Sequence, residues 1–204
     1  MPSPVGHTIA GLAVALISQK RKNRRYIFPI ILCVFFATVP DFDFIPGLLM
    51  NRPALFHGDL THSIGFAFVI SAVAAVSLRL KGLSILSTFT LGFTSYLTHL
   101  LLDLFNPDGR PPYGIPLLWP ISETYYLSPW TMFTGVQHAS STSTTTLDFL
   151  RQVITFHNIK AIGVEILLVT PISILIIWLR HKYASKAGKI RSEGVWKENR
   201  AKMQ

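Results

Sequence analysis

Five apolar segments, divided by short polar stretches, constrain the fold of this chain more than any other feature. They span residues 5–18, 26–50, 62–78, 83–105 and 159–179. A transmembrane helix needs roughly 20 apolar residues, with about 17 as the lower end, so the first segment is short for a full span. Only 14% of the residues are charged, against ~25% in soluble domains. We therefore expect an all-α, polytopic membrane protein with four to five transmembrane helices.

The basic residues predict the orientation. Fifteen of the 19 Lys and Arg residues follow the first, third or fifth segment, and the positive-inside rule places such stretches in the cytoplasm. This divides the chain into a transmembrane domain (residues 1–180, with an interfacial loop at 106–158) and a basic cytoplasmic tail (181–204). The net charge of +9 then suits anionic lipid headgroups better than nucleic acid.

Polar side chains recur at one depth of the predicted bundle. At a rise of ~1.5 Å per residue, four of them lie about 20–24 Å from the basic side: His7, Asp41, His99 and Glu165. His62 opens the third segment at a comparable level. In a hydrocarbon core of ~30 Å this depth falls in the non-cytoplasmic leaflet. Ionisable groups inside apolar spans are costly and usually functional, which predicts a site at this level.

Two pairs of residues suggest a divalent-metal site. His99 and Asp103 form H-x-x-x-D, so both side chains share one face of a helix. Pro40 and Pro46 are expected to break the second segment, and Pro171 to kink the fifth. Asp41 and Asp43 lie at the first of these breaks, where irregular backbone lets both carboxylates turn toward one point. The alternatives are a helix-surface pair and an interfacial loop with two solvated acids.

The remaining candidates come from the loop before the third segment and from two isolated positions. Thr61 is expected to cap the third helix, with His62 in its first turn and His57 in the preceding loop. Asp59 is a candidate to orient either imidazole. His7 and Glu165 are single polar residues in apolar surroundings, and a structural role for each is the alternative.

Together these residues predict a site for one or two divalent ions, zinc first and manganese second. The predicted metal ligands are His7, Asp41, Asp43, His57, His62, His99 and Asp103. The predicted catalytic carboxylates, which would take a proton from metal-activated water, are Asp41, Asp43 and Glu165.

Several motifs within residues 4–120 make the chain resemble the YdjM family, bacterial and archaeal membrane proteins described as metal-dependent hydrolases. They are G-H-T, P-D-F-D, H-G-D-L-T-H-S, G-F-T-S-Y-L-T-H-L-L-L-D-L-F-N-P and G-I-P-L-L-W-P. The resemblance implies the same seven metal-site candidates. It also shows a departure: family members often have Arg after the first histidine of the third motif, where this chain has Gly58. A phosphate-contacting role for that Arg is then lost or passes to Arg52 or Arg110.

These observations lead to two classes of functional hypothesis. The first is a metal-dependent hydrolase of the plasma (inner) membrane, with its site facing outside, that cleaves an ester or phosphoester of a lipid or lipid-linked substrate. The second is non-enzymatic: a metal sensor, a metal- or proton-coupled carrier, or a membrane protein stapled by a structural metal.

Overall fold

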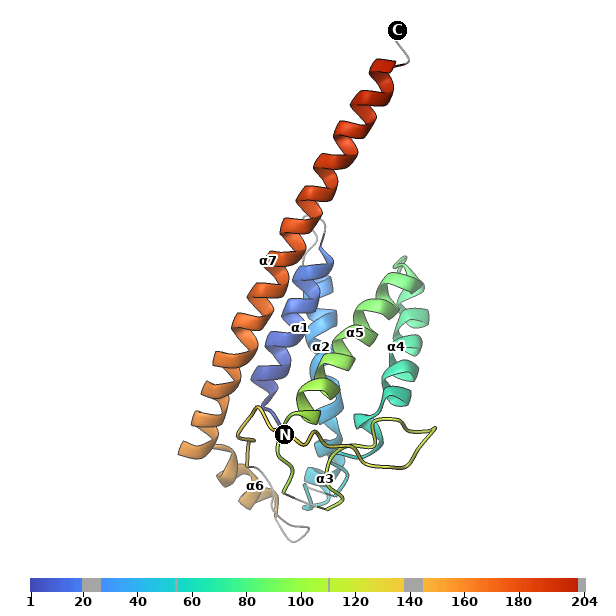
Figure 1. Cartoon of the computed structure of the whole chain (residues 1–204). Coiled ribbons are helices and arrows are strands. Elements are labelled where there is room, and N and C mark those ends of the chain that lie inside the picture. The colour runs from blue at the N-terminus through green and yellow to red at the C-terminus, as the bar shows by residue number, and fades with distance from the viewer. Residues whose placement is uncertain (20–26, 54, 110, 138–144, 202–204) are drawn as a thin grey trace.

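The protein is a helical bundle, seen here in a computed structural model that describes residues 1–19, 27–53, 55–109, 111–137 and 145–201, with side chains up to residue 184. The elements are α1 (Pro4–Ser18), α2 (Ile27–Thr38), the 3-10 turn η1 (Val39–Asp43), α3 (Phe44–Leu49), the 3-10 turn η2 (Leu60–His62), α4 (Ile64–Arg79), α5 (Ile85–Leu104), α6 (Thr146–Val153) and α7 (Phe156–Ala201). Helix α1 packs between α2 and α7, and α5 packs between α2 and α4 (Figure 1). The predicted all-α class is confirmed for the described residues.

Three stretches are long and apolar enough to cross a membrane: Ile27–Leu49, Ile85–Leu104 and Phe156–Ala184. Helices α1 and α4 are also apolar but have 15 and 16 residues, below the ~17 that a span needs. The short first segment is as expected, whereas the total of four to five spans remains a prediction. Helix α7 continues past residue 180 without a break, so the predicted division there rests on charge alone.

Proline acts differently at the two positions where a break was predicted, Pro40 and Pro46, and at Pro171, where a kink was predicted. Helix α2 ends at Thr38, and Pro40 lies at the start of η1, as predicted. Pro46 was expected to break the chain again but lies in the first turn of α3, where its missing N–H has no helical partner to lose. Pro171 lies inside α7, which remains one helix through it.

Small residues bring α1 close to α2. A Cβ built on Gly11 would lie 2.8 Å from both the Ala37 Cβ and the Cys33 carbonyl oxygen, so glycine is required at this contact. Close approach at small residues is typical of helix pairs in membranes. Its consequence is that His7, one turn before Gly11, lies beside the end of α2.

The segment after α5 crosses the end of the bundle and satisfies exposed helix termini. The Ile64 and Gly65 amides of α4 donate to the carbonyls of Leu117 and Trp119, at 2.9 and 3.1 Å. The carbonyl of Leu104 accepts from the Ser128 amide at 2.9 Å. This loop therefore lies over the ends of both helices.

Helix α6 was not predicted, because the whole of 106–158 was expected to be a loop. Its N-cap, Thr145, accepts from the Asp148 amide and donates its hydroxyl to the Asp148 carboxylate at 2.6 Å. This T-x-x-D pattern is a capping box, and it is the signal in the sequence that could have located the helix.

Candidate metal centre

Four chain segments deliver polar side chains to one end of the bundle. Helix α1 begins there, α2 ends there at η1, η2 precedes α4 there, and α5 reaches its last turns there (Figure 1). The α4–α5 turn lies at the opposite end. The predicted convergence at one level is therefore confirmed for α1, η1, η2 and α5, whereas the side of the membrane it faces remains a prediction. The basic run 20–25 that supports that orientation lies outside the described residues.

Four donor atoms at this end form a set suited to a single ion. They are His62 Nε2, His99 Nε2, Asp41 Oδ1 and Asp103 Oδ2. His99 Nε2 lies 3.2 Å from His62 Nε2, 3.0 Å from Asp103 and 3.8 Å from Asp41, while His62 Nε2 lies 3.4 Å from Asp103 and 3.7 Å from Asp41. Ligands at ~2.0–2.1 Å from a tetrahedral ion are about 3.3 Å apart. The separations of 3.0–3.4 Å among His62, His99 and Asp103 therefore fit three ligands of one tetrahedral ion, and Asp41 lies 3.7–3.8 Å from both imidazoles.

The rings of both histidines are oriented with Nε2 toward this point. The Nδ1 of His99 bonds to the Ala37 carbonyl at 2.8 Å, near the end of α2. The Nδ1 of His62 lies 3.3 Å from Asp43 Oδ2. If each Nδ1 carries the proton, two Nε2 lone pairs face each other, an arrangement that a cation between them stabilises. Such outer hydrogen bonds are the usual means of fixing a metal-ligating imidazole.

Burial strengthens the case for an ion. The side chains of His7, His62 and His99 are 0% exposed. Among the described residues, both ring nitrogens of His7 and both carboxylate oxygens of Asp103 are buried without a hydrogen-bond partner. Buried polar groups are nearly always satisfied, and a bound cation would satisfy these.

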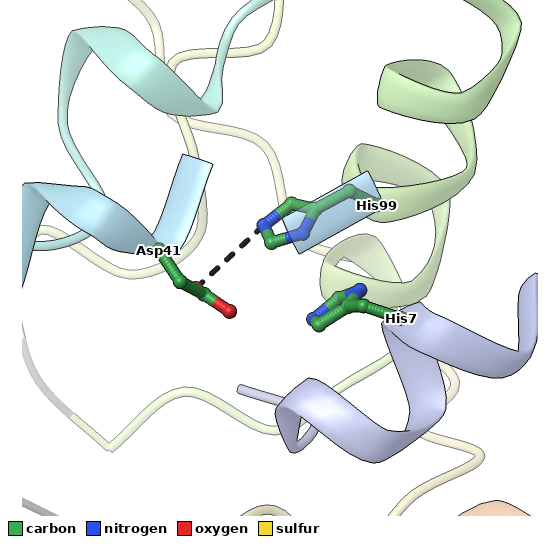
Figure 2. A group of neighbouring side chains, drawn as sticks. All are labelled: His7, Asp41 and His99. Atoms are coloured by element: carbon green, nitrogen blue, oxygen red, sulfur yellow. Dashed lines mark ion pairs between the residues drawn. The ribbon is translucent and has the colours of Figure 1, made fainter. Parts of the chain in front are cut away.

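Figure 2 shows how His7 and Asp41 lie relative to His99. The imidazole of His7 stacks on that of His99, with ring centroids 3.8 Å apart. Its Nε2 lies 3.8 Å from Asp103 Oδ1. Asp41 points toward both rings from η1, and its carboxylate is 15% exposed, more than the other carboxylates of the set. His7 is thus a further possible donor next to His99 and Asp103.

Asp43 orients the histidines rather than facing the same point. Its Oδ1 lies 2.7 Å from His57 Nδ1, while its Oδ2 accepts from the Gly58 amide at 3.1 Å and the Thr61 hydroxyl at 2.8 Å. The ring of His57 stacks on Phe44, with centroids 3.6 Å apart. Asp43 therefore positions His57 and η2, and its predicted role as a direct ligand remains untested.

Two expectations for this loop are wrong. Ser63, not Thr61, caps α4, because Thr61 is held by Asp43 within η2. Asp59, expected to orient an imidazole, instead accepts from the Tyr125 hydroxyl at 3.3 Å. The buried Tyr96 hydroxyl donates to the Thr61 carbonyl at 2.5 Å and so ties η2 to α5, a role that the sequence did not suggest.

Electrostatics differ between the two loop histidines. Burial lowers the pKa of His57, against an opposing effect of the Asp43 carboxylate. Burial also acts on His62, but the carboxylates of Asp41 and Asp43 outweigh it and raise the pKa of His62 to about 10. In the metal-free protein at neutral pH, the His62 ring therefore carries a proton on both nitrogens, and a metal would have to displace one of them.

Glu165 belongs to a separate contact. Its carboxylate accepts from the amide of Ser3 at 2.7 Å and from the Ser3 hydroxyl, and a Cβ on Gly6 would lie 2.9 Å from its Oε2. It is fully buried, as expected for its depth. The structure thus pairs Glu165 with the N-cap of α1, which favours the structural alternative over the predicted catalytic role. The Ser3-Pro4 start of α1 is a signal for this cap that sequence reasoning missed.

Taken together, six residues form three overlapping groups whose donor atoms lie within 4.8 Å of one another. The groups are His7–Asp41–His99, Asp41–His57–His62 and His62–His99–Asp103. Each pair of groups shares one residue. This number of donors exceeds the needs of one tetrahedral ion and leaves room for a second ion, or for free acid–base groups beside the first.

Comparison with known proteins places the chain in a family. The family model of the YdjM inner membrane protein matches residues 1–184. The chain belongs to the YdjM family. One relative is the inner membrane protein YbcI of Escherichia coli (strain K12), 27% identical over 150 residues that cover 71% of this chain and 83% of the relative. No solved structure matches.

Membership of the YdjM family agrees with the resemblance found in the sequence and with the three candidate spans. The chain is therefore an inner membrane protein of this family. The structure suits a glycine at position 58, where this chain departs from the family motif. The φ of Gly58 is 83°, which glycine adopts without strain, and the Gly58 amide donates to Asp43. Of the two candidates to replace the family arginine, Arg52 is exposed and Arg110 lies outside the described residues.

Proposed function

We propose that this protein is a membrane-embedded, metal-dependent hydrolase that cleaves a phosphoester or another ester of a lipid or lipid-linked substrate. The observation that supports it best is the cluster of six His and Asp side chains, all of them buried except Asp41. A divalent ion bound there would polarise the scissile bond and lower the pKa of coordinated water to about 7. Zinc suits this mixture of imidazole and carboxylate, and manganese is the alternative.

The residues of the chain would divide the remaining work. Asp41 has the most exposed carboxylate of the set and is the candidate to accept a proton from the attacking water. His57, held by Asp43, and His7, stacked on His99, are buried imidazoles and candidates for further proton acceptors beside the ion. A general acid or base typically contributes 10²–10⁴-fold to the rate.

The position of these side chains supports a lipid substrate. His99 and Asp103 lie in the last turns of the candidate span Ile85–Leu104, and Asp41 lies in the second half of the span Ile27–Leu49. These donors would then lie toward the level where a lipid ester bond meets the headgroup. The neighbouring Phe42, Ile45 and Leu49 have exposed side chains. A substrate with an apolar tail would have apolar surface to contact here.

A structural metal is the second candidate, because four protein donors can by themselves close a tetrahedral coordination sphere. In that case His7 and His57 would not bind the metal. The two candidates differ in one property that can be measured: a hydrolase keeps a position for water, and a staple does not.

The test combines an activity assay with a water measurement. Purified protein would be stripped of metal, reloaded with zinc or manganese, and assayed on phospholipids and simple phosphoesters in mixed micelles. We expect hydrolysis that depends on the ion and falls at least 100-fold in Asp41→Asn, with Asp59→Asn as a control that keeps wild-type activity. A manganese-loaded protein with no exchangeable water by electron-nuclear double resonance and no turnover would contradict the hydrolase and support the staple.

A further inference from the structure

Helix α6 is strongly amphipathic although it has only eight residues. Viewed down its axis, Asp148, Arg151 and Gln152 occupy one arc, and the apolar residues occupy the rest. Phe149 turns inward and packs on Phe44, with ring centroids 5.3 Å apart. Leu147 and Leu150, spaced i and i+3, and the C-cap residue Ile154 directly after the helix form an outward stripe in which Leu150 is 56% and Ile154 83% exposed.

Both ends of α6 are fixed to the ends of candidate spans. At its start, the Thr146 hydroxyl donates to the Leu48 carbonyl at 2.9 Å and its amide donates to Asn51 at 2.8 Å. Leu48 lies in the last turn of the span Ile27–Leu49. The first link therefore holds the N-terminus of α6 level with one end of that span.

The second link uses a buried side chain. Asn158 lies in the first turn of the span Phe156–Ala184, and its amide donates to the carbonyls of Gln152 and Val153 at 2.8 and 3.1 Å. The same side chain pairs in both directions with the backbone of Gln137 at 2.7 and 2.8 Å. Helix α6 is therefore held at the level where both spans would leave the hydrocarbon.

Contacts also connect α6 to the candidate metal centre. Phe149 packs on Phe44, Phe44 stacks on the His57 ring at 3.6 Å, and His57 pairs with Asp43. One side of the helix thus reaches the site through two rings, while the other presents its apolar stripe outward. Leu49 and Met50, at the end of the neighbouring span, are exposed as well.

We propose that α6 lies flat in the lipid–water boundary of the bilayer, with Leu147, Leu150 and Ile154 among the lipid acyl chains and Asp148 and Gln152 in water. The occupant of the stripe is bilayer lipid, because both span ends that fix α6 also expose apolar side chains, among them Leu49, Phe156 and Ile159. Amphipathic helices with such a stripe bind at this level. The helix then presents membrane lipid directly beside the Phe44–His57 side of the centre. This placement holds whether or not the centre is hydrolytic.

Site-directed spin labelling of the full chain in phosphatidylcholine–phosphatidylglycerol nanodiscs tests the depth of α6. Single cysteines would replace Leu150, Ile154 and, as the matched control, Gln152, in a Cys33→Ala background. Power saturation compares collisions with oxygen, which concentrates in lipid, and with a water-soluble nickel chelate. We expect oxygen to exceed nickel at least threefold at residues 150 and 154, and nickel to exceed oxygen at residue 152.

Two outcomes would overturn the proposal. Preference for nickel at all three positions would place α6 in water, and poor access of both reagents at 150 and 154 would mean that protein covers the stripe. Leu147→Cys provides an independent reading of the same stripe if a label at 150 disturbs folding. The metal content and elution volume of each labelled protein, compared with the parent, show whether the bundle remains intact.

Discussion

At the scale of single residues, the sequence predicts Asp59 as the carboxylate that orients an imidazole, whereas in the structure Asp43 contacts His57 and Asp59 does not. Asp43 holds His57, Gly58 and Thr61, whereas Asp59 meets only Tyr125 among the contacts described above. Outer carboxylates of this kind typically change metal affinity 10–100-fold. We expect Asp43→Asn to weaken zinc binding by about that factor, while Asp59→Asn leaves it unchanged. Calorimetric titration of both variants checks this, and equal effects would contradict the assignment.

Another residue-scale prediction concerns pH. His62 has a pKa raised to about 10 in the metal-free protein, so a metal must displace its proton at neutral pH. Affinity should then rise with pH, by about tenfold per unit for each proton displaced. Titration in buffers of different ionisation enthalpy measures both the affinity and the protons released. Binding that is constant between pH 6 and 8, with no proton release, would rule out His62 as a protonated ligand.

At the scale of elements, the contact between α1 and α2 controls where His7 lies. A Cβ at Gly11 meets Ala37 and the Cys33 carbonyl at 2.8 Å, so Gly11→Ala must push the helices apart. Overpacking of this kind costs about 1–3 kcal/mol. We expect a lower unfolding temperature in detergent together with weaker metal binding, because His7 moves with α1.

Gly163→Ala in α7 is the matched control, since a Cβ there has nothing within 4 Å. It should leave the unfolding temperature within error of the wild type or raise it slightly, as alanine favours helix. If Gly11→Ala behaved the same way, the close α1–α2 contact would not be what positions His7.

The elements themselves were predictable where hydropathy decides them. The five apolar segments became α1, α2 with η1 and α3, α4, α5 and the first part of α7. Helix α6 was missed because eight residues inside a polar loop give no hydropathy signal, and only its capping box identifies it. The role of Pro46 was misjudged because a proline in the first turn of a helix leaves it intact.

At the scale of the whole molecule, the depth of the polar side chains along the bundle was predictable from the sequence, whereas the rotation of each helix about its own axis was not. The fixed helical rise brought His7, Asp41 and His99 to one level, and these residues do meet. Glu165 has the same depth, but it faces Ser3, because a depth argument contains no information about which way a helix is turned. The pairing of Asp43 with His57 depends on the path of an irregular loop, which no periodicity specifies.

The central claim is that His99 and Asp103, with His62 and Asp41, bind a divalent metal. Metal content measured by mass spectrometry on detergent-purified protein tests it most directly, with His99→Ala/Asp103→Ala beside wild type and His157→Ala as a control that removes a histidine bonded to the Gly135 carbonyl. We predict at least one zinc or manganese per chain in wild type and in the control, lost in the double variant with its elution volume unchanged. Wild-type protein that holds no metal after loading, or a double variant that keeps its metal, would contradict the account.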